Sequence, residues 1–251
     1  MMKKILPFLF ALCLCLQPVH KGWAAPGRPD LSWTLRAVTE DELVRLGMSN
    51  RGPDLNACLD ILSRLNTEEP FYILRDMRRE KKLKVPVDFN AYRNWTPLPR
   101  RLPEKLNSPK MIMLVKHLGF IGWYENGALV GDSQACIGGA GQSTVPGLYR
   151  VDDKDAKHTS SSYRNDYGEQ AWMPYSLHIY EAVWIHAGNV LGLHCSHGCI
   201  TLPWGNAEKL YTWADKGTPV LVTDDLKDVC GGVGESGPLN HLGAPRKSSG
   251  R

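Results

Sequence analysis

The residues best suited to covalent chemistry lie in one stretch, HAGNVLGLHCSHGCITL, which runs from His186 to Leu202. Within it Cys199 follows Gly198, and a cysteine beside a glycine in a turn can present both its sulfur and a free backbone N–H to a ligand. A thiol with the ordinary pKa of about 8.5 is a modest nucleophile at neutral pH, and a neighbouring imidazole activates it by accepting its proton. The stretch therefore predicts a nucleophilic Cys199 assisted by a histidine.

Two histidines are candidates for the base. His186 ends the apolar run Val183-Trp184-Ile185, which predicts a buried strand, so His186 can approach the thiol from a separate element. His197 is two residues from Cys199 in the same turn, and its ring is expected to point away from the sulfur. We therefore predict His186 as general base and acid, and His197 as a structural or substrate-facing residue.

The turn itself is expected to stabilise negative charge on a reacting carbonyl. The backbone N–H groups of Gly198 and Cys199 can point at an oxyanion, because Gly198 lets the chain turn without a Cβ in the way. Ser196 is predicted to fix the turn or to hydrogen-bond His197.

Other interpretations of the same residues stay open. Four potential metal ligands fall within six residues, but so tight a cluster does not easily close a tetrahedral zinc site, and no metal is predicted. Cys199 would otherwise be a disulfide partner and His186 a buried core histidine. Cys136 lies in Gln134-Ala135-Cys136-Ile137-Gly138, which is only superficially similar to a caspase nucleophile motif and is expected in a strand, so we interpret Cys136 as a packing or disulfide residue. The four potential ligands are His194, Cys195, His197 and Cys199.

Composition gives no support to a nucleic-acid partner. The 251 residues carry a formal net charge of +4, and three of the positive charges, Lys3, Lys4 and Lys21, fall in the first 24 residues, which contain no acidic residue. The rest of the chain is close to neutral, without the basic excess of a nucleic-acid-binding domain. The hydrophobic content of 43% is sufficient for a core.

Residues 1–24 have the features of a secretory signal peptide. Lys3 and Lys4 precede an apolar run from Ile5 to Leu16 that is short for a membrane span, and Gly22-Trp23-Ala24 supplies small residues before a cleavage site. An uncleaved anchor is the alternative. We expect an exported protein of the periplasm or cell envelope, with no stable membrane span after cleavage.

Five cysteines remain after the signal peptide, and an odd number in an exported protein suggests one free thiol and up to two disulfides. The pairing stays open, and a reversible bond between Cys195 and Cys199 is a further possibility. The five are Cys58, Cys136, Cys195, Cys199 and Cys230.

Residues 25–109 predict a small helical and wrapping region of unknown role. Thr39 and Glu42 form a capping box for a first helix, and Asp54 caps a second. The basic stretch from Arg75 to Lys84 is interpreted as a solvated helix face, with contact to an anionic polymer as the alternative. Four prolines between 95 and 109 indicate a wrapping segment that ends in a domain boundary.

Residues 110–226 change in character to short strands. Glu125-Asn126-Gly127 predicts a hairpin turn, because Asn-Gly readily adopts positive φ. The polar segment from Asp152 to Gln170, with Tyr163, Tyr167 and Trp172, predicts a lid. Asn206 is expected to cap a helix after the cysteine loop, and 227–251 to form a disordered tail.

The SHGCITL motif at 196–202, the upstream strand ending in Ile185-His186-Ala187 and the downstream Gly217-Thr218-Pro219-Val220 together resemble the L,D-transpeptidase catalytic domain of the YkuD type. The resemblance runs from about 110 to 224 and includes Met173-Pro174-Tyr175. It implies a mostly β fold, an L,D-transpeptidase-type β-sandwich with a short helix after the cysteine loop. It also implies acylation by carbapenem-type inhibitors.

The resemblance implies an exported, cysteine-dependent L,D-transpeptidase that needs no cofactor. Its substrate would be a peptidoglycan stem peptide, and its acceptor an amine of another stem peptide, a protein Lys or a D-amino acid. The expected substrate-binding residues are Ser196, His197, Thr201 and Tyr175. Thr201 replaces the family's usual Arg or Asn, and the segment from His186 to Ser196 is shorter than usual. A hydrolase on the same fold and a non-catalytic wall-binding protein are the alternatives.

Overall fold

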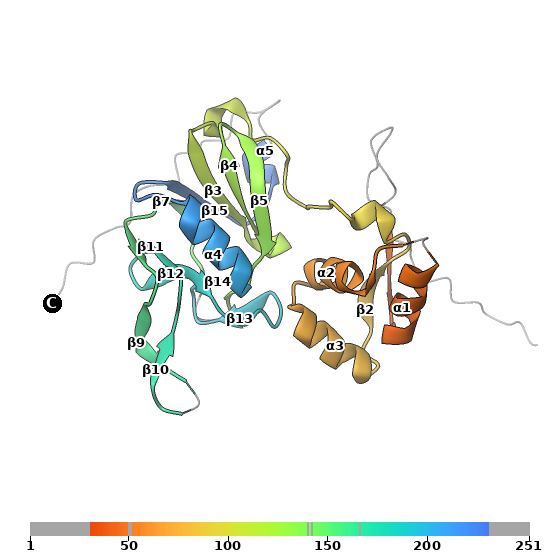
Figure 1. Ribbon diagram of the computed structural model, residues 1–251. Coiled ribbons are helices and arrows are strands. Elements are labelled where there is room, and N and C mark those ends of the chain that lie inside the picture. The colour runs from red at the N-terminus through yellow and green to blue at the C-terminus, as the bar shows by residue number, and fades with distance from the viewer. Residues whose placement is uncertain (1–30, 50–51, 140, 142, 166, 231–251) are drawn as a thin grey trace, which may run out of the picture.

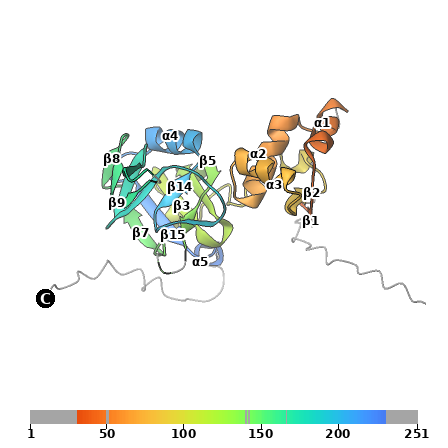
Figure 2. The ribbon, with the colours of Figure 1, turned by 90° about the horizontal axis from the view of Figure 1, so that it is seen from below.

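The computed structural model describes residues 31–49, 52–139, 141, 143–165 and 167–230. They form an N-terminal helical part and a larger β part, which lie side by side and are joined by an extended segment (Figures 1 and 2). The expected signal peptide, 1–24, and most of the expected tail, 231–251, lie outside the described residues. None of the described helices has the length and apolar character needed to cross a bilayer.

The N-terminal part packs three helices against a two-stranded sheet. The first helix starts as the capping box predicts, since the Thr39 hydroxyl accepts from the Glu42 N–H at 3.2 Å. The Asp54 carboxylate caps the second helix by accepting from the Ala57 N–H at 2.9 Å. The elements are β1 (Trp33–Arg36), α1 (Glu40–Met48), α2 (Leu55–Asn66), α3 (Pro70–Arg78), β2 (Leu83–Pro86) and the 3-10 turns η1 (Asn90–Tyr92) and η2 (Glu104–Leu106).

This part has an apolar core of its own, to which every helix contributes. Leu43 of α1, Leu62 of α2 and Ile73 of α3 are fully buried, as is Val85 of β2. The basic stretch that follows Arg75 covers the end of α3, an exposed turn and β2, so the predicted helix face is helical only as far as Arg78.

The β part contains a five-stranded sheet in the order β5-β4-β3-β15-β7. The predicted turn joins β4 to β5, with Asn126 at φ 45° and Gly127 at φ 74°, as a tight hairpin turn requires. The strands are β3 (Lys110–Val115), β4 (Phe120–Glu125), β5 (Ala128–Gln134), β7 (Gly147–Arg150) and β15 (Pro219–Thr223), and the 3-10 turn η3 (Lys116–Leu118) links the first two.

A second sheet of four strands, in the order β14-β12-β11-β8, faces the first. At one edge of this sheet β14 pairs in parallel with β12, and Ile185 lies opposite Ile200. Two small two-stranded sheets, β6 with β13 and β9 with β10, complete the part. The remaining strands are β6 (Ile137–Gly138), β8 (Asp153–Asp155), β9 (Thr159–Arg164), β10 (Gln170–Trp172), β11 (Ser176–Tyr180), β12 (Val183–Ala187), β13 (His194–Ser196) and β14 (Ile200–Leu202).

The main core lies between the two large sheets and α4 (Trp204–Trp213). Ile112 and Ile121 from one sheet meet Ile185 and Ile200 from the other, all of them at most 1% exposed. The predicted fold class, mostly β with a few helices and a short helix after the cysteine loop, is confirmed by this arrangement.

The start of α4 differs from the prediction. Asn206 lies inside the helix, which begins two residues earlier with Pro203 in the N-cap position. The Asn206 amide donates to the Ser133 hydroxyl of β5 at 2.9 Å, so its polar group ties the helix to the five-stranded sheet and does not cap it.

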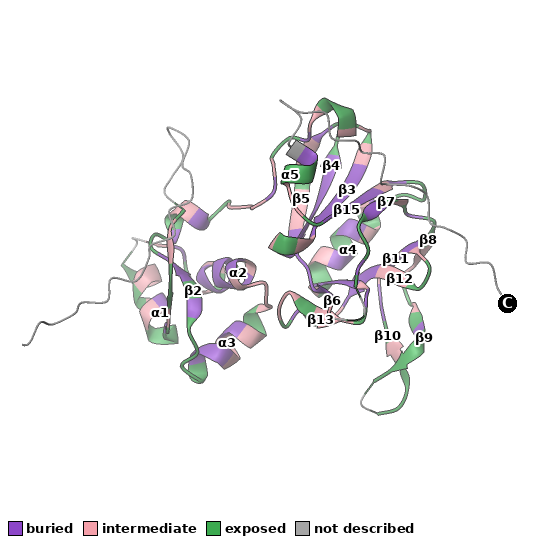
Figure 3. Ribbon diagram, turned by 180° about the vertical axis from the view of Figure 1, so that it is seen from behind, coloured by how far each residue is buried: buried purple, intermediate pink, exposed green. Residues whose placement is uncertain are grey.

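The proline-rich segment covers the other face of the five-stranded sheet. Leu98 and Leu102 pack there against Met113 and Tyr124, and Val229 of the short helix α5 (Lys227–Cys230) joins them. In Figure 3, β3 and β4, which this segment covers, are coloured mainly as buried. The segment expected to be a tail thus begins with a helical turn over 227–230.

Candidate active site

The register of the four-stranded sheet places the predicted catalytic residues on one face. Ile185 and Ile200 are paired neighbours whose side chains both enter the core. Side chains alternate along a strand, so His186, which follows Ile185, and Cys199, which precedes Ile200, are directed to the opposite face. The two residues therefore lie diagonally across adjacent strands.

The tautomer of the neutral His186 ring is set by its backbone neighbour. Its Nδ1 lies 2.8 Å from the Ala187 carbonyl, and because a carbonyl only accepts, Nδ1 must carry the proton. Nε2 is then the basic nitrogen of the neutral ring. The side chain is buried, and this burial lowers the pKa of His186, with a smaller contribution from nearby His158.

Cys199 is a free thiol in this structure. Its Sγ lies 3.7 Å from the Ala182 carbonyl, beside the start of β12, and burial raises its pKa. The pKa shifts of Cys199 and His186 both disfavour transfer of the thiol proton to the imidazole at rest, because burial disfavours the thiolate and the imidazolium alike. The resting site is thus a neutral thiol with a neutral imidazole.

The turn before Cys199 is fixed by Ser196. The Ser196 hydroxyl donates to the Cys199 carbonyl at 2.5 Å and accepts from the Gly198 N–H at 3.2 Å. Gly198 has φ 119°, which a residue with a side chain rarely adopts. Of the two predicted roles of Ser196, the structure shows the fixing of the turn. It also occupies the Gly198 N–H that we predicted as an oxyanion donor.

Thr144 is a supporting residue that the sequence did not single out. Its buried hydroxyl donates to the Gly198 carbonyl at 2.8 Å and accepts from the Gly138 N–H at 3.0 Å. Thr144 lies far from the motif in sequence, so no local pattern connected it with this turn.

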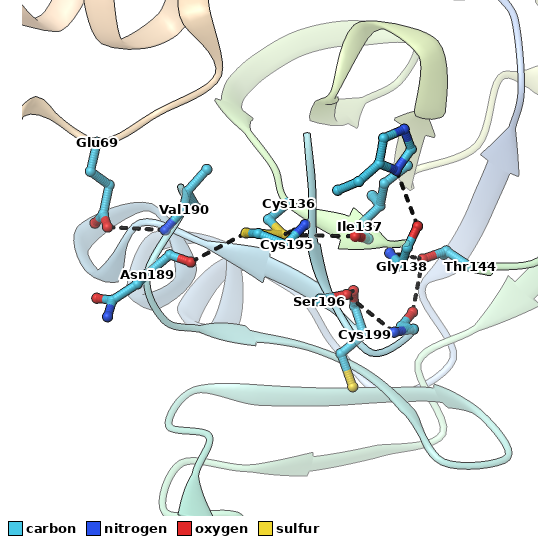
Figure 4. Close-up of a disulfide and its surroundings, with 12 residues drawn as sticks. Glu69, Cys136, Ile137, Gly138, Thr144, Asn189, Val190, Cys195, Ser196 and Cys199 are labelled. Carbon is cyan, nitrogen blue, oxygen red and sulfur yellow. Dashed lines mark hydrogen bonds between the residues drawn. A yellow bond between two sulfur atoms is a disulfide. The ribbon is translucent and has the colours of Figure 1, made fainter. Parts of the chain in front are cut away.

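The cysteine pairing is resolved for the described side chains. Cys136 and Cys195 form a disulfide with a Cα–Cα distance of 5.5 Å, which ties β6 to β13 at the edge of the cysteine loop (Figure 4). Cys58 is a free, buried thiol whose pKa burial raises to about 11. Cys195 is therefore unavailable to Cys199. Nowhere in the described residues do three His, Cys, Asp or Glu side chains gather as a metal site would require.

The segment predicted as a lid is largely a β hairpin. Strands β9 and β10 pair within it, and the ring of Tyr163 stacks on His197 with centroids 4.5 Å apart and an interplanar angle of 25°. The exposed His197 thus contacts the hairpin, while Tyr167 is 89% exposed near its tip.

An aromatic and histidine cluster lies on the same sheet face and was not predicted. Trp184, two residues before His186, stacks on His158 with centroids 3.9 Å apart and also contacts His178 at 4.5 Å. His178 in turn lies 2.5 Å from Asp152. This cluster lies beside β12. The sequence could have indicated only that Trp184 shares a face of the strand with His186, because side chains alternate along a strand.

Two predicted substrate-binding residues make contacts within the protein, although one of them, Thr201, lies opposite His186 in the pairing of β12 with β14. Thr201 is only 7% exposed, and a Cβ added to Gly188 would come within 2.8 Å of its methyl group, so Thr201 packs against the backbone. The Tyr175 hydroxyl donates to Glu208 of α4 at 2.9 Å, and its ring contacts Trp204. The contacts of Tyr175 are therefore with the helix.

Several solved structures are similar to part of this chain. A cysteine-to-serine mutant of an Enterococcus faecium L,D-transpeptidase is 22% identical, with 47% of this chain and 50% of that chain covered and a TM-score of 0.42. An L,D-transpeptidase from Mycobacterium smegmatis is 17% identical, with 46% and 58% covered and a TM-score of 0.41.

L,D-transpeptidase 3 from Mycobacterium tuberculosis, in complex with a faropenem-derived adduct, is 22% identical, with 46% of this chain and 60% of that chain covered and a TM-score of 0.41. The chain thus spans 50% to 60% of the length of these three structures. The comparison with curated proteins finds no match. Residues 110–222 match the family model of the L,D-transpeptidase catalytic domain, YkuD, which confirms the family resemblance carried by the Cys199 motif.

Proposed function

We propose that the protein is an exported, cysteine-dependent L,D-transpeptidase that acts on peptidoglycan stem peptides. The observation that carries the proposal is the placement of Cys199 and His186 on one sheet face, with Nε2 of His186 left as the base by the bond from Nδ1 to Ala187. The family match over 110–222 supports peptidoglycan as the substrate class.

The first half-reaction is acyl transfer to the enzyme. The Cys199 sulfur attacks the carbonyl carbon of diaminopimelate in a stem tetrapeptide, and His186 Nε2 takes the thiol proton. The tetrahedral oxyanion accepts from the Cys199 N–H, and from the Gly198 N–H once that group releases Ser196. The C–N bond then breaks, the imidazolium gives its proton to the amine, and D-Ala leaves a thioester on Cys199.

The second half-reaction resolves the thioester. An amine of another stem peptide, a protein Lys or a D-amino acid attacks the carbonyl, His186 removes its proton, and the thiol is regenerated. Ser196 and His197 face the reacting group from the cysteine loop, and the Tyr163 hairpin limits the access of water. Carbapenem-type inhibitors acylate Cys199 by the same attack on their strained carbonyl.

A hydrolase on the same fold is the second candidate, and the burial of Thr201 favours it. The position two residues after the nucleophile offers a substrate hardly any surface, so the site has fewer groups with which to orient an amine acceptor. Water would then resolve the thioester, releasing a peptide.

Mass spectrometry of muropeptides incubated with the mature protein distinguishes the candidates. New crosslinks or exchanged terminal residues indicate a transpeptidase, and shortened peptides indicate a hydrolase. Unchanged muropeptides would contradict both and favour a non-catalytic wall-binding protein.

The nucleophile is tested by substitution. Cys199→Ala is expected to lower turnover by at least about 10³-fold, because no other group can form the acyl-enzyme. His194→Ala is the matched control in the same stretch. Its exposed ring only contacts the Gly138 carbonyl, at 3.2 Å, and activity should be retained. Full activity of Cys199→Ala would refute the assignment.

A further inference from the structure

The N-terminal part contacts the segment that separates the two predicted catalytic residues. The Glu69 N–H donates to the Val190 carbonyl at 3.0 Å, and the Val190 N–H donates to Glu69 Oε2 at 3.1 Å. Val190 lies between His186 and the disulfide-bonded Cys195. The side chain of Glu69 reaches it from the N-terminal ribbon in Figure 4. One residue therefore satisfies both backbone polar groups of Val190.

Glu69 is placed for this contact by its own helix. It is the N-cap residue of α3, with Pro70 in the first turn, and its backbone carbonyl accepts from the Tyr72 and Ile73 N–H groups. An N-cap side chain ordinarily accepts from its own helix, but that of Glu69 makes no such bond. Its carboxylate is directed to Val190 instead.

The contact is partly shielded from water. Val190 is fully buried, and burial raises the pKa of Glu69, an effect that the bond from Val190 partly offsets. A hydrogen bond is stronger in such surroundings, and a buried N–H that loses its partner is destabilising.

The rest of the segment is fastened to the β part on both sides of Val190. Before it, the Gly188 N–H donates to the Leu202 carbonyl at 3.0 Å. After it, the Ile137 N–H donates to the Leu193 carbonyl at 2.8 Å, and the disulfide holds Cys195. Glu69 thus completes the support of a short segment whose two ends carry His186 and the cysteine loop.

We propose that Glu69 is a positioning residue, which acts through Val190 to hold the segment between His186 and Cys199, so that the N-terminal part belongs to the catalytic unit. This inference rests on the proposed function for its catalytic meaning. It assigns a role to a region for which the sequence indicated none.

The test compares Glu69→Ala with Glu69→Gln in the whole mature chain. Alanine removes the acceptor for Val190, whereas glutamine keeps an amide oxygen at the same place. In the alanine variant we expect hydrogen exchange of the Val190 amide, followed by NMR, to accelerate about tenfold, the factor that one buried hydrogen bond represents. Glutamine should restore most of the protection.

The consequence for the site is measured on Cys199. In Glu69→Ala, kcat should fall about three- to tenfold with little change in KM, because alignment is lost while the substrate surface remains. Alkylation of Cys199 by iodoacetamide should become faster by a similar factor, because loosening the segment relieves the burial of the thiol. Glutamine should reverse both effects.

Asp132→Asn is the matched control. It weakens a different contact between the two parts, the ion pair at 2.7 Å between Arg64 of α2 and Asp132 of β5. It should leave Val190 exchange and Cys199 alkylation unchanged. The inference would be overturned if Asp132→Asn had the same effects as Glu69→Ala. It would also be overturned if Glu69→Ala left Val190 exchange, Cys199 alkylation or kcat unchanged. Hydrogen exchange and alkylation are measured without a muropeptide substrate. A failure of the proposed function can therefore be distinguished from a failure of the inference about Glu69.

Discussion

At the scale of single residues, the proposed chemistry depends on two groups whose pKa shifts both favour the uncharged form. Burial raises the pKa of Cys199 and lowers that of His186, so the proton stays on sulfur until a substrate arrives. The imidazole is then a base that acts during the attack. A preformed thiolate is not needed, provided that Nε2 is directed at the thiol when the carbonyl is in place.

The rate of Cys199 alkylation should therefore keep rising with pH to values above the ordinary thiol pKa of about 8.5, without a plateau near neutrality. Turnover should be lost in acid as pH falls through the lowered pKa of His186, below about 6.5, because a protonated ring is no base. Alkylation and turnover rates measured between pH 5 and 10 check the rise at high pH and the loss in acid.

His186→Gln separates the neutral pair from an ion pair. With both groups neutral, the substitution should leave alkylation of Cys199 at pH 7 nearly unchanged while turnover collapses. An alkylation plateau between pH 6 and 7 that disappears in His186→Gln would instead indicate a thiolate–imidazolium pair.

At the scale of elements, the β9–β10 hairpin contacts the cysteine loop through an aromatic stack, and Trp172 of β10 also contacts Trp204 of α4. Tyr163 lies over His197, beside the turn that Ser196 and Thr144 hold in shape. A stacked pair of this kind contributes about 0.5–1.5 kcal/mol beyond its buried area. The hairpin is thus held closed weakly enough to admit a substrate.

Tyr163→Ala should open the hairpin and raise the ratio of hydrolysis to transfer by about two- to tenfold, because water then reaches the thioester more readily. Tyr167→Ala is the control, since Tyr167 belongs to the same hairpin and is 89% exposed. Product ratios from an assay with a labelled amine acceptor measure the effect. A larger shift in Tyr167→Ala than in Tyr163→Ala would contradict the assigned role.

At the scale of the whole molecule, the two parts are joined by polar contacts that are largely removed from water. Arg64 pairs with Asp132, with both side chains about one-sixth exposed, and its guanidinium also donates to the Trp95 carbonyl and lies over the ring of Phe120. The Gln134 amide donates to the Ser63 hydroxyl at 3.1 Å. Such contacts are specific, since each donor requires its partner at a fixed place.

Asp132→Asn should lower the free energy of unfolding by about 1–3 kcal/mol, because Arg64 then keeps a partly buried charge without its carboxylate. Chemical denaturation followed by circular dichroism measures the change. Lys216→Gln removes a fully exposed ion pair with Asp153 and should not shift the midpoint. Equal midpoints for wild type and Asp132→Asn would show that the ion pair contributes nothing measurable to stability.

The features that the sequence determined by itself are those with a local physical cause. Thr39 and Asp54 mark helix starts because an N-cap needs only backbone groups two or three residues away. Asn126-Gly127 specifies its hairpin through the φ angles that these residues tolerate. The motif around Cys199 predicted the resemblance to the L,D-transpeptidase catalytic domain, which the match over 110–222 confirmed, because its residues lie next to one another in the chain.

The tertiary structure decided everything that depends on distance through space. It paired Cys195 with Cys136, 59 positions away, and brought the hydroxyl of Thr144 to Gly198. It directed the amide of Asn206, which we predicted as a helix cap, to a strand, and the carboxylate of Glu69, the N-cap residue of α3, to Val190. Side-chain capping competes with tertiary hydrogen bonds of similar strength, and only the packed chain determines which partner is closer.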